Sequence, residues 1–327
     1  MTGPRAKRED APEGVLCIDK PKGPTSHDVV ARIRRALGTS RVGHAGTLDP
    51  MASGVLVVLV GEATKLAPYL TAHDKRYEAT VVLGRATDTL DAEGQTTTEG
   101  AVSDDLAAEL ARVEAGDGPA PILEAALAAE RARAEQIPPS YSAIKVDGER
   151  SYARARAGED VELPARPVEV RALRVLRASA PREGAPASVD LELAVSKGYY
   201  VRSLARDVGD LLGVPAHLGR LRRVASGPFH IEGAVALDVG SAGLAAALIP
   251  VADAAALGLP VARLTTAGTE RAGHGKRLLA DDFSAPPHDE APHAWLDEAG
   301  RLVAVGTRRE DGYIVDRGFC RSAARSE

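Results

Sequence analysis

Cysteine is scarce in this chain of 327 residues, and so are aromatic side chains and long apolar runs. Two cysteines, Cys17 and Cys320, are too few for a disulfide framework or a cysteine-based zinc site, which suits a reducing compartment. No apolar run approaches the roughly eighteen residues of a membrane span. The N-terminus, MTGPRAKREDAPEG, lacks the apolar segment of a secretory signal. These absences predict a soluble, cytoplasmic, globular protein with no membrane partner.

Motifs for a bound phosphate or metal are also missing. The glycine-rich run GHAGTLDPMASG, which begins at Gly43, lacks the final Gly-Lys-Ser/Thr of a Walker A loop and is not a dinucleotide-binding fingerprint. His44 has no second His, Cys or Asp beside it at metal-ligand spacing. Phosphate cradling is therefore disfavoured, and we expect no metal.

The net charge of −5 argues at first against a polyanionic partner, but the charge is unevenly distributed. Ala101–Glu130 contains seven acidic residues and one arginine, and Asp281–Gly300 contains six acidic residues and no basic one, so the rest of the chain is net positive. Local patches decide whether a phosphate backbone can bind. A solvated face would explain any one of the basic clusters. They are Arg32, Arg34 and Arg35; Lys75 and Arg76; Arg150, Arg154 and Arg156; and Arg220, Arg222 and Arg223.

The clearest helix signal begins near Ser26. Thr25 and Asp28 have the spacing of a capping box, and Gly38 stands where a C-terminal cap belongs. An apolar stripe at helical spacing joins these two ends. We expect strands at Ile18–Lys20, Val55–Val60 and Arg76–Leu83, and a strand, glycine turn and helix closed by Gly213 in LELAVSKGYYVRSLARDVGDLLG.

Composition divides the chain into three parts. Residues 1–12 read as a flexible tail and residues 13–257 as a large domain, in which the acidic, alanine-rich stretch 101–135 reads as a surface insertion. The segment that starts at Gln136 is expected to be extended at its prolines, to turn at Asp147-Gly148 and then to form a short arginine-bearing helix. Residues 258–327 read as a small β domain, because short β-prone pieces alternate there with Gly and acidic turns.

One carboxylate, Asp49, lies in a glycine-rich loop just before an aliphatic strand. Asp-Pro is a common turn pair, so an isolated Asp49 would more often be structural. Gly43, Gly46 and Gly54, however, remove side chains around it, which leaves a concavity where a ligand can approach the backbone. We therefore regard Asp49 as the candidate reactive group.

The few tyrosines concentrate beside basic residues. Tyr77 follows Lys75 and Arg76, Tyr141 precedes Lys145, and the pair Tyr199-Tyr200 lies between Lys197 and Arg202. Amphipathic strands with wet hydroxyl groups would explain any one of these placements. Aromatic rings interleaved with cations are also what stacks and clamps an unpaired base.

These segments together resemble the TruB-type pseudouridine synthases, which isomerise uridine 55 in the T-arm of tRNA. The run GHAGTLDPMASGVLVVLVGEATK is similar to the catalytic motif of that family. Further motifs follow in the family's order between about residues 14 and 235: Lys20-Pro21-x-Gly23-x-Thr25-Ser26, Lys75-x-Tyr77, Gln136-x-Pro138-Pro139-x-Tyr141-Ser142-Ala143-x-Lys145, and Ser196-Lys197-Gly198-x-Tyr200-x-Arg202.

The resemblance implies a fold, a partner and a set of roles. The implied fold is α+β, a mixed, largely antiparallel sheet flanked by helices, with a small C-terminal PUA-like RNA-binding domain. The implied enzyme acts on tRNA as a monomer without cofactor or metal. Asp49 matches the catalytic aspartate, Tyr77 the tyrosine stacked on the flipped uracil, and Arg202 the arginine paired with the aspartate. We expect the substrate RNA to be bound by Lys20, Pro21, Gly43, His44, Lys145, Tyr200 and Arg222.

Two features depart from the family's pattern. Tyr199 stands where the family usually has a threonine, and the acidic stretch from Ala101 to Glu130 has no counterpart in the matched motifs. Tyr199 would change packing beside Arg202, and the acidic stretch would bear on tRNA docking. Neither touches Asp49.

The chemistry of uridine isomerisation agrees with a lone carboxylate. The base must leave its stack, detach from the ribose at N1 and rejoin through C5. An ionised Asp49, charge-paired with Arg202, suits attack at C6, attack at C1′ or proton abstraction. Two rival classes are a non-catalytic RNA-binding module, which has no need of Asp49, and a glycoside hydrolase, which requires a second acid that the sequence does not reveal. A guide-RNA-dependent relative would usually carry basic extensions, whereas this tail ends in RSAARSE.

Overall fold

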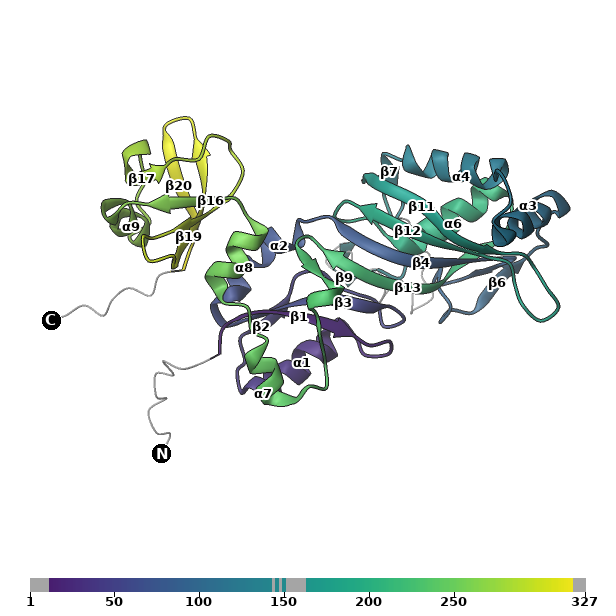
Figure 1. The fold of residues 1–327 in the computed structure, drawn as a ribbon, viewed down its shortest axis with the longest axis horizontal. Helices are drawn as coiled ribbons and strands as arrows, with labels where there is room; N and C mark the ends of the chain where they lie inside the picture. The colour runs from purple at the N-terminus through teal and green to yellow at the C-terminus, as the bar shows by residue number, and fades with distance from the viewer. Residues whose placement is uncertain (1–11, 143–144, 147–148, 151–162, 320–327) are drawn as a thin grey trace.

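The computed structural model describes residues 12–142 and 163–319, together with the backbone of residues 145–146 and 149–150. A large mixed sheet with helices on its faces forms the main body, and a small β domain follows at the C-terminal end (Figure 1). Three expectations lie outside the described residues: the tail over residues 1–11, the turn at 147–148 and the helix within 151–162.

The large sheet has nine strands, most of them antiparallel, which confirms the expected fold class. Its two parallel contacts are β1 with β15 and β13 with β3. The order along the sheet is β11 (Val170–Ser179), β12 (Ser188–Val195), β4 (Lys75–Leu83), β13 (Ala216–Ser226), β3 (Ser53–Val60), β1 (Gly14–Lys20) and β15 (Val235–Ala236), with β2 (Val42–His44) on β3 and β14 (Phe229–His230) on β13.

The sheet has two halves that meet at a very short contact. Strand β13 runs along most of β4 but pairs with β3 at only two positions, Arg222 with Ser53 and Arg223 with Gly54. Gly54 has φ +101°, and a Cβ atom there would lie 2.2 Å from the carbonyl oxygen of Arg223. Glycine is therefore required for this approach. The contact places the loop that precedes β3, which carries Asp49, beside β13.

Strand β3 is aliphatic from Val55 to its end because both of its faces are covered there. Val55, Val57 and Leu59 join one buried cluster, and the alternate residues join another with helix α1. Helix α1 (Ser26–Leu37) has the predicted capping box between Thr25 and Asp28 and ends at Gly38 in the left-handed conformation. Helix α7 (Gly240–Ala246) packs beside α1 on the same part of the sheet (Figure 1).

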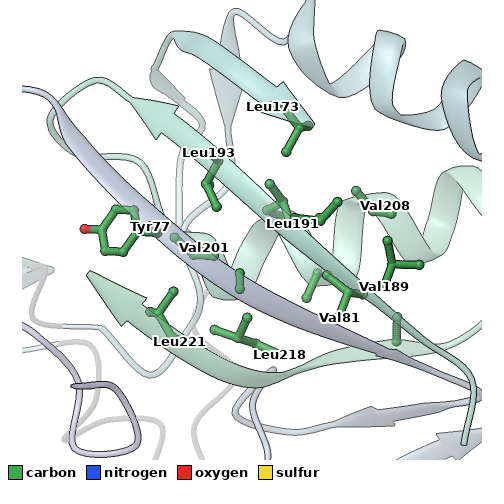
Figure 2. Close-up of a cluster of buried hydrophobic side chains, with 14 of the residues drawn as sticks. Tyr77, Val81, Leu173, Val189, Leu191, Leu193, Val201, Val208, Leu218 and Leu221 are labelled. Carbon is green, nitrogen blue, oxygen red and sulfur yellow. The ribbon is translucent and has the colours of Figure 1, made fainter. Parts of the chain in front are cut away.

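Helices α3 (Asp104–Ala115), α4 (Pro121–Arg131) and α6 (Val201–Leu212) lie together on the other half of the sheet (Figure 1). Strands β4, β12 and β13 and helix α6 bury a continuous aliphatic cluster there, in which Leu191 and Leu218 are fully buried (Figure 2). Fully burying a side chain of this size contributes about 1.5–3 kcal/mol relative to leaving it exposed. This half is therefore a rigid platform for residues at the start of α6.

The expectation that 101–135 is a surface insertion needs correction in one respect. Leu106 and Leu110 of α3, and Leu123 and Leu127 of α4, belong to the main buried cluster. Within α3 and within α4 these leucines are four residues apart, which places each pair on one face of its helix. The two helices are thus a layer of the domain.

The C-terminal domain is a five-stranded sheet with its own core around Trp295. It also packs on the large domain, because Phe319 and Leu296 share a buried cluster with Leu66 and Ala255. Lys65 donates to the carbonyl of residue 318 at 2.8 Å, which adds a polar contact across this junction. Helix α8 (Val251–Gly258) precedes this domain, whose elements are β16 (Val261–Leu264), α9 (Thr266–Gly273), β17 (Phe283–Ala285), β18 (His293–Leu296), β19 (Leu302–Arg309) and β20 (Gly312–Gly318).

Short elements complete the chain. Helices η1 (Gly61–Leu66) and α2 (Ala67–Thr71) connect β3 to β4. Three two-stranded pairs lie outside the large sheet: β5 (Arg85–Thr87) with β6 (Thr96–Glu99), β7 (Glu135–Gln136) with β10 (Arg166–Pro167), and β8 (Lys145–Val146) with β9 (Glu149–Arg150). Within the described part of the chain, no helix has the length and apolar character needed to cross a membrane.

Candidate active site

An ion pair between Asp49 and Arg202 joins two segments that are 153 residues apart in the sequence. The Nε of Arg202, in the first turn of α6, donates to Oδ2 of Asp49 at 2.9 Å. The Arg202 side chain is 7% exposed and that of Asp49 is 32% exposed. The arginine is thus fixed inside the protein, while the carboxylate still faces solvent and is accessible to a ligand.

The remaining donors of Arg202 bind two further segments. Its Nη1 donates to the carbonyl of Thr89 at 3.1 Å, and its Nη2 donates to the carbonyl of Tyr141 at 3.0 Å. A second carboxylate, that of Asp91, has its Oδ2 3.7 Å from Nε. One planar guanidinium group therefore fixes three chain segments relative to helix α6: the Asp49 loop, the turn with Thr89 and Asp91, and the segment of Tyr141.

The sequence analysis assigned no part in the site to the turn that contains Asp91. Oδ1 of Asp91 accepts from Oγ1 of Thr89 at 2.7 Å and from the amide of Glu93 at 3.0 Å, and the residue is 6% exposed. Leu90 has φ +61°, the one positive φ outside glycine among the described residues. Such strain is typical of functional sites. The Thr-x-Asp pattern was the available signal, since these side chains often close turns.

Buried side chains form hydrogen bonds with the backbone of the Asp49 loop. Arg223 is 1% exposed, although the sequence suggested a surface cluster. Its guanidinium donates to the carbonyls of Val55, Thr47 and Gly46 at 2.6, 3.2 and 3.2 Å. Ser26 Oγ donates to the carbonyl of Leu48 at 2.9 Å and accepts from the amide of the same residue. The loop therefore has few alternative conformations.

Lys20 belongs to the same support and is fully buried. Its Nζ donates to the carbonyls of Pro21 and Pro24, each at 2.9 Å, and lies 3.5 Å from that of Pro50. Burial lowers the pKa of Lys20 to about 8, and the carboxylate of Asp49 opposes this shift. Lys20 thus ties the loop to the end of β1 and does not reach the surface, whereas Pro21 is exposed.

Lys75 and Arg222 also differ from the expected pattern of free surface cations. Lys75 is buried and donates to the carbonyls of Thr71 and His73, both at 2.6 Å. Burial, with Arg223 nearby, lowers the pKa of Lys75 to about 8. Arg222 is partly exposed and pairs with Asp19 at 2.9 Å. Several of the expected basic positions therefore hold the fold together.

His44 lies at the end of β2, next to the loop. Its ring meets that of His27 edge-on, with the centroids 5.5 Å apart. Burial, together with His27 and Arg223, lowers the pKa of His44, which favours the neutral ring. Its Nδ1 is buried and has no hydrogen-bond partner among the described residues. Gly43 lies in β2, opposite Leu59 of β3. Apart from Gly43 itself and its two chain neighbours, no described residue would have an atom within 4 Å of a Cβ atom at this position.

The two candidate tyrosines approach the loop from different sides. Tyr77, in β4, is 8% exposed and shares a buried cluster with Leu48 and Met51, which flank Asp49. Figure 2 shows its ring at one end of the cluster, with the hydroxyl group pointing away from the labelled aliphatic side chains. Burial raises the pKa of Tyr200, whose hydroxyl also feels the charges of Arg202 and Asp49. The side chain of Lys145 lies outside the described residues.

This geometry suits chemistry by one accessible carboxylate. Asp49 is positioned to act as a nucleophile, a base or a negative charge beside an electron-poor centre. Asp91 is buried and hydrogen-bonded within its own turn, so it orients Arg202 and does not face a ligand. Among the described residues, no group of three or more His, Cys, Asp or Glu side chains could hold a metal ion.

Comparison with known families gives two adjoining matches. Residues 34–201 match the family described as TruB family pseudouridylate synthase (N terminal domain), and residues 202–245 match the tRNA pseudouridylate synthase B C-terminal domain. The first match contains Asp49 and Tyr77 and ends one residue before Arg202.

Two similar proteins from other organisms share the name tRNA pseudouridine synthase B. The tRNA pseudouridine synthase B of Thermobifida fusca is 45% identical over 300 residues, which cover 91% of this chain and 95% of that protein. The protein of that name from Cutibacterium acnes is 44% identical over 309 residues, covering 94% and 97%.

Solved structures give the same fold. An H/ACA RNP bound to a substrate RNA containing 2'-deoxyuridine has a chain with a TM-score of 0.67 and 24% identity, covering 98% of this chain and 92% of that one. A chain of a Cbf5-Nop10-Gar1 complex has a TM-score of 0.64 and 26% identity, covering 93% and 83%.

The support of the loop can be tested by stability. Arg223→Met removes a buried guanidinium group and its hydrogen bonds to the carbonyls of Val55, Thr47 and Gly46, and each buried group left unsatisfied costs about 1–3 kcal/mol. We expect the free energy of unfolding in urea to fall by about 3–5 kcal/mol. Arg222→Met is the matched control, because the partly exposed pair with Asp19 is worth about 1 kcal/mol or less. Equal losses in the two variants would contradict this account of Arg223.

Proposed function

Because this chain belongs to the TruB family of pseudouridylate synthases, we propose that it isomerises uridine 55 in the T-arm of tRNA to pseudouridine. Enzymes of this class are isomerases, since the product has the same atoms as the substrate. The related proteins named tRNA pseudouridine synthase B support tRNA as the substrate. The choice of position 55 rests on the motif resemblance around Asp49.

The ion pair of Asp49 with Arg202 carries the proposal. Conversion of uridine to pseudouridine breaks the bond from N1 to C1′, turns the base and forms a bond from C5 to C1′, and a proton moves from C5 to N1. It needs no oxidant and no outside group. A carboxylate held at 2.9 Å from a buried guanidinium, yet 32% exposed, suits a nucleophile or charge partner that waits for an extruded nucleoside. Attack at C6, attack at C1′ and proton abstraction all fit this position.

The RNA must present the uridine outside its stack. We assign to Tyr77, beside the loop, the stacking on the flipped base. We assign to His44, whose Nδ1 has no hydrogen-bond partner in the described part of the chain, the gap that the base leaves or a bond to the displaced loop. Exposed arginines suit contacts to phosphate: Arg32, Arg35, Arg76 and Arg220. The C-terminal β domain extends the surface that such an RNA would cover, in the manner of a PUA domain.

The proposal requires no metal, no cofactor and no second subunit. A single chain supplies every side chain that we assign to the chemistry. The rearrangement of the base conserves all atoms of the nucleoside and involves no oxidation or reduction. We therefore propose a monomeric enzyme that works in the cytoplasm, where tRNA is processed.

The rival readings fit the site less well. A glycoside hydrolase needs two carboxyl groups that flank the scissile bond. Asp91 is the second carboxylate near Arg202, but its side chain is 9% exposed, its Oδ1 accepts hydrogen bonds within the turn and its Oδ2 lies 3.7 Å from Arg202 Nε. A purely RNA-binding module would gain nothing from a carboxylate at this position, since negative charge repels phosphate.

Substitution of Asp49 tests the catalytic assignment. Asp49→Asn keeps the shape but removes the charge, so we expect pseudouridine formation on a T-arm hairpin to become undetectable. Asp49→Glu keeps the charge but moves it, and a misplacement of about 1 Å can cost a hundredfold in rate. RNA affinity by filter binding should survive in both variants, because phosphate contacts supply much of it.

A thermal melt of each Asp49 variant is the control for folding. Turnover by a folded Asp49→Asn variant within about tenfold of the wild type would remove Asp49 from the chemistry.

Tyr77 has a separate prediction. Tyr77→Phe keeps the ring, so we expect RNA affinity within about twofold of the wild type, whereas Tyr77→Leu should weaken it by about 1–3 kcal/mol. Because stacking needs no hydroxyl group, Tyr77→Phe should also keep its turnover. Loss of turnover with normal binding would instead give the hydroxyl a part in proton transfer. Full activity in both variants would exclude Tyr77 from the site.

A further inference from the structure

Helix α6, which carries Arg202, has no side-chain cap of its own. Tyr200 occupies the N-cap position, and its side chain makes no capping hydrogen bond. The first amide groups of a helix lack partners within the helix, so an uncapped first turn must be held by something else. Arg202 lies in this turn, so whatever holds the turn also sets the direction of the guanidinium group.

The segment 130–137, which runs from the last turn of α4 to the two prolines that follow it, supplies these contacts. The Gln136 side chain binds both backbone groups of Tyr200: its Oε1 accepts from the amide at 2.8 Å, and its Nε2 donates to the carbonyl at 3.2 Å. The carbonyl of Ile137 accepts from Ser203 Oγ at 2.9 Å and from Arg206 Nη2 at 3.0 Å. The segment thus acts as an external cap.

The start of this segment is held by a buried polar network centred on Glu130. The hydroxyl group of Tyr199 donates to Glu130 Oε1 at 2.7 Å, and Arg133 Nε donates to Oε2 at 2.6 Å. The same Nε lies 3.6 Å from Asp207 of α6. The Glu130 side chain is fully buried and Tyr199 is 8% exposed. A carboxylate in such surroundings is stable only where its hydrogen bonds are complete, so the network fixes one arrangement.

The two departures from the family's pattern therefore meet in one contact. Tyr199 immediately precedes the N-cap residue of α6, and Glu130 lies in the last turn of α4, at the end of the acidic stretch. A phenol hydroxyl reaches this carboxylate across the gap between the two helices. The contact joins the α3–α4 layer to the turn that carries Tyr200 and Arg202.

We propose that Tyr199 is a positioning residue for the reaction: through Glu130 and the segment 130–137 it fixes the first turn of α6 and hence the orientation of Arg202 toward Asp49. The inference rests on the proposed function for its catalytic readout. Because Tyr199 is buried, we expect its substitution to change the rate of conversion of bound RNA and not the affinity for RNA.

The test compares Tyr199→Phe with Tyr313→Phe. Both tyrosines are 8% exposed, and the hydroxyl of Tyr313 donates to the carbonyl of Pro287 inside the C-terminal domain, far from Asp49. At saturating T-arm RNA we expect Tyr199→Phe to lower the single-turnover rate about tenfold, part of the hundredfold that a displacement of about 1 Å can cost. The dissociation constant for RNA should stay within about twofold, and Tyr313→Phe should match the wild type in both.

A double variant shows whether Tyr199 acts through Glu130. If it does, Tyr199→Phe combined with Glu130→Gln is about as slow as Glu130→Gln alone. Independent losses that multiply would contradict the proposal. So would a Tyr199→Phe variant with a wild-type rate, or one whose only defects are in melting temperature and RNA affinity. If Tyr199→Phe does not fold, Glu130→Gln supplies the same comparison of rate with affinity.

Hydrogen exchange gives a readout that does not depend on activity. The amide of Tyr200, which donates to Gln136, should exchange about tenfold faster in Tyr199→Phe and at an unchanged rate in Tyr313→Phe. Unchanged exchange in Tyr199→Phe would overturn the proposal even if the wild type is inactive on T-arm RNA. An inactive wild type with faster exchange would leave the positioning role intact and count against the proposed function alone.

Discussion

The buried guanidinium group of Arg202 is the constraint on which the site depends. Its Nε holds Asp49, and its two terminal nitrogens hold the carbonyls of Thr89 and Tyr141. These three segments are distant in sequence and have no common secondary structure, so the arginine is what makes them one site. Its planar, always charged fork suits this task, because its donors point in fixed directions, whereas the ammonium group of a lysine is a compact point charge. The aliphatic platform under α6 keeps its backbone in place.

A second group of cations prepares the loop that Arg202 holds. Arg223 and Lys20 donate to loop carbonyls from inside the protein, and Lys75 lies beneath the same region. Buried cations are costly unless their donors are satisfied, and here backbone carbonyls supply the partners. The carboxylate of Asp49 is therefore held in a positive environment in the free protein, which is the preorganisation that its proposed part in catalysis requires.

Local signals in the sequence predicted the local structure. The cap of α1 needs only Thr25, Asp28 and Gly38, so spacing sufficed. Asp91 was missed because its role depends on a contact with α6 that no spacing encodes. Arg223 was grouped with Arg222 as a surface cation, yet neighbours in a strand face opposite sides of the sheet, and one of the two is buried. Average composition hid the leucines of α3 and α4, whose four-residue spacing indicated a buried face.

We propose that a single carboxylate in this chain converts one uridine of the tRNA T-arm without help from a metal or cofactor. The direct measurement is nucleotide-resolution mapping of pseudouridine in a tRNA transcript that has been incubated with the purified protein in the presence of EDTA. If the proposal is right, position 55 is modified at the same rate with and without the chelator. Modification confined to other positions, dependence on an added metal, or no pseudouridine at all with folded, RNA-binding protein would contradict it.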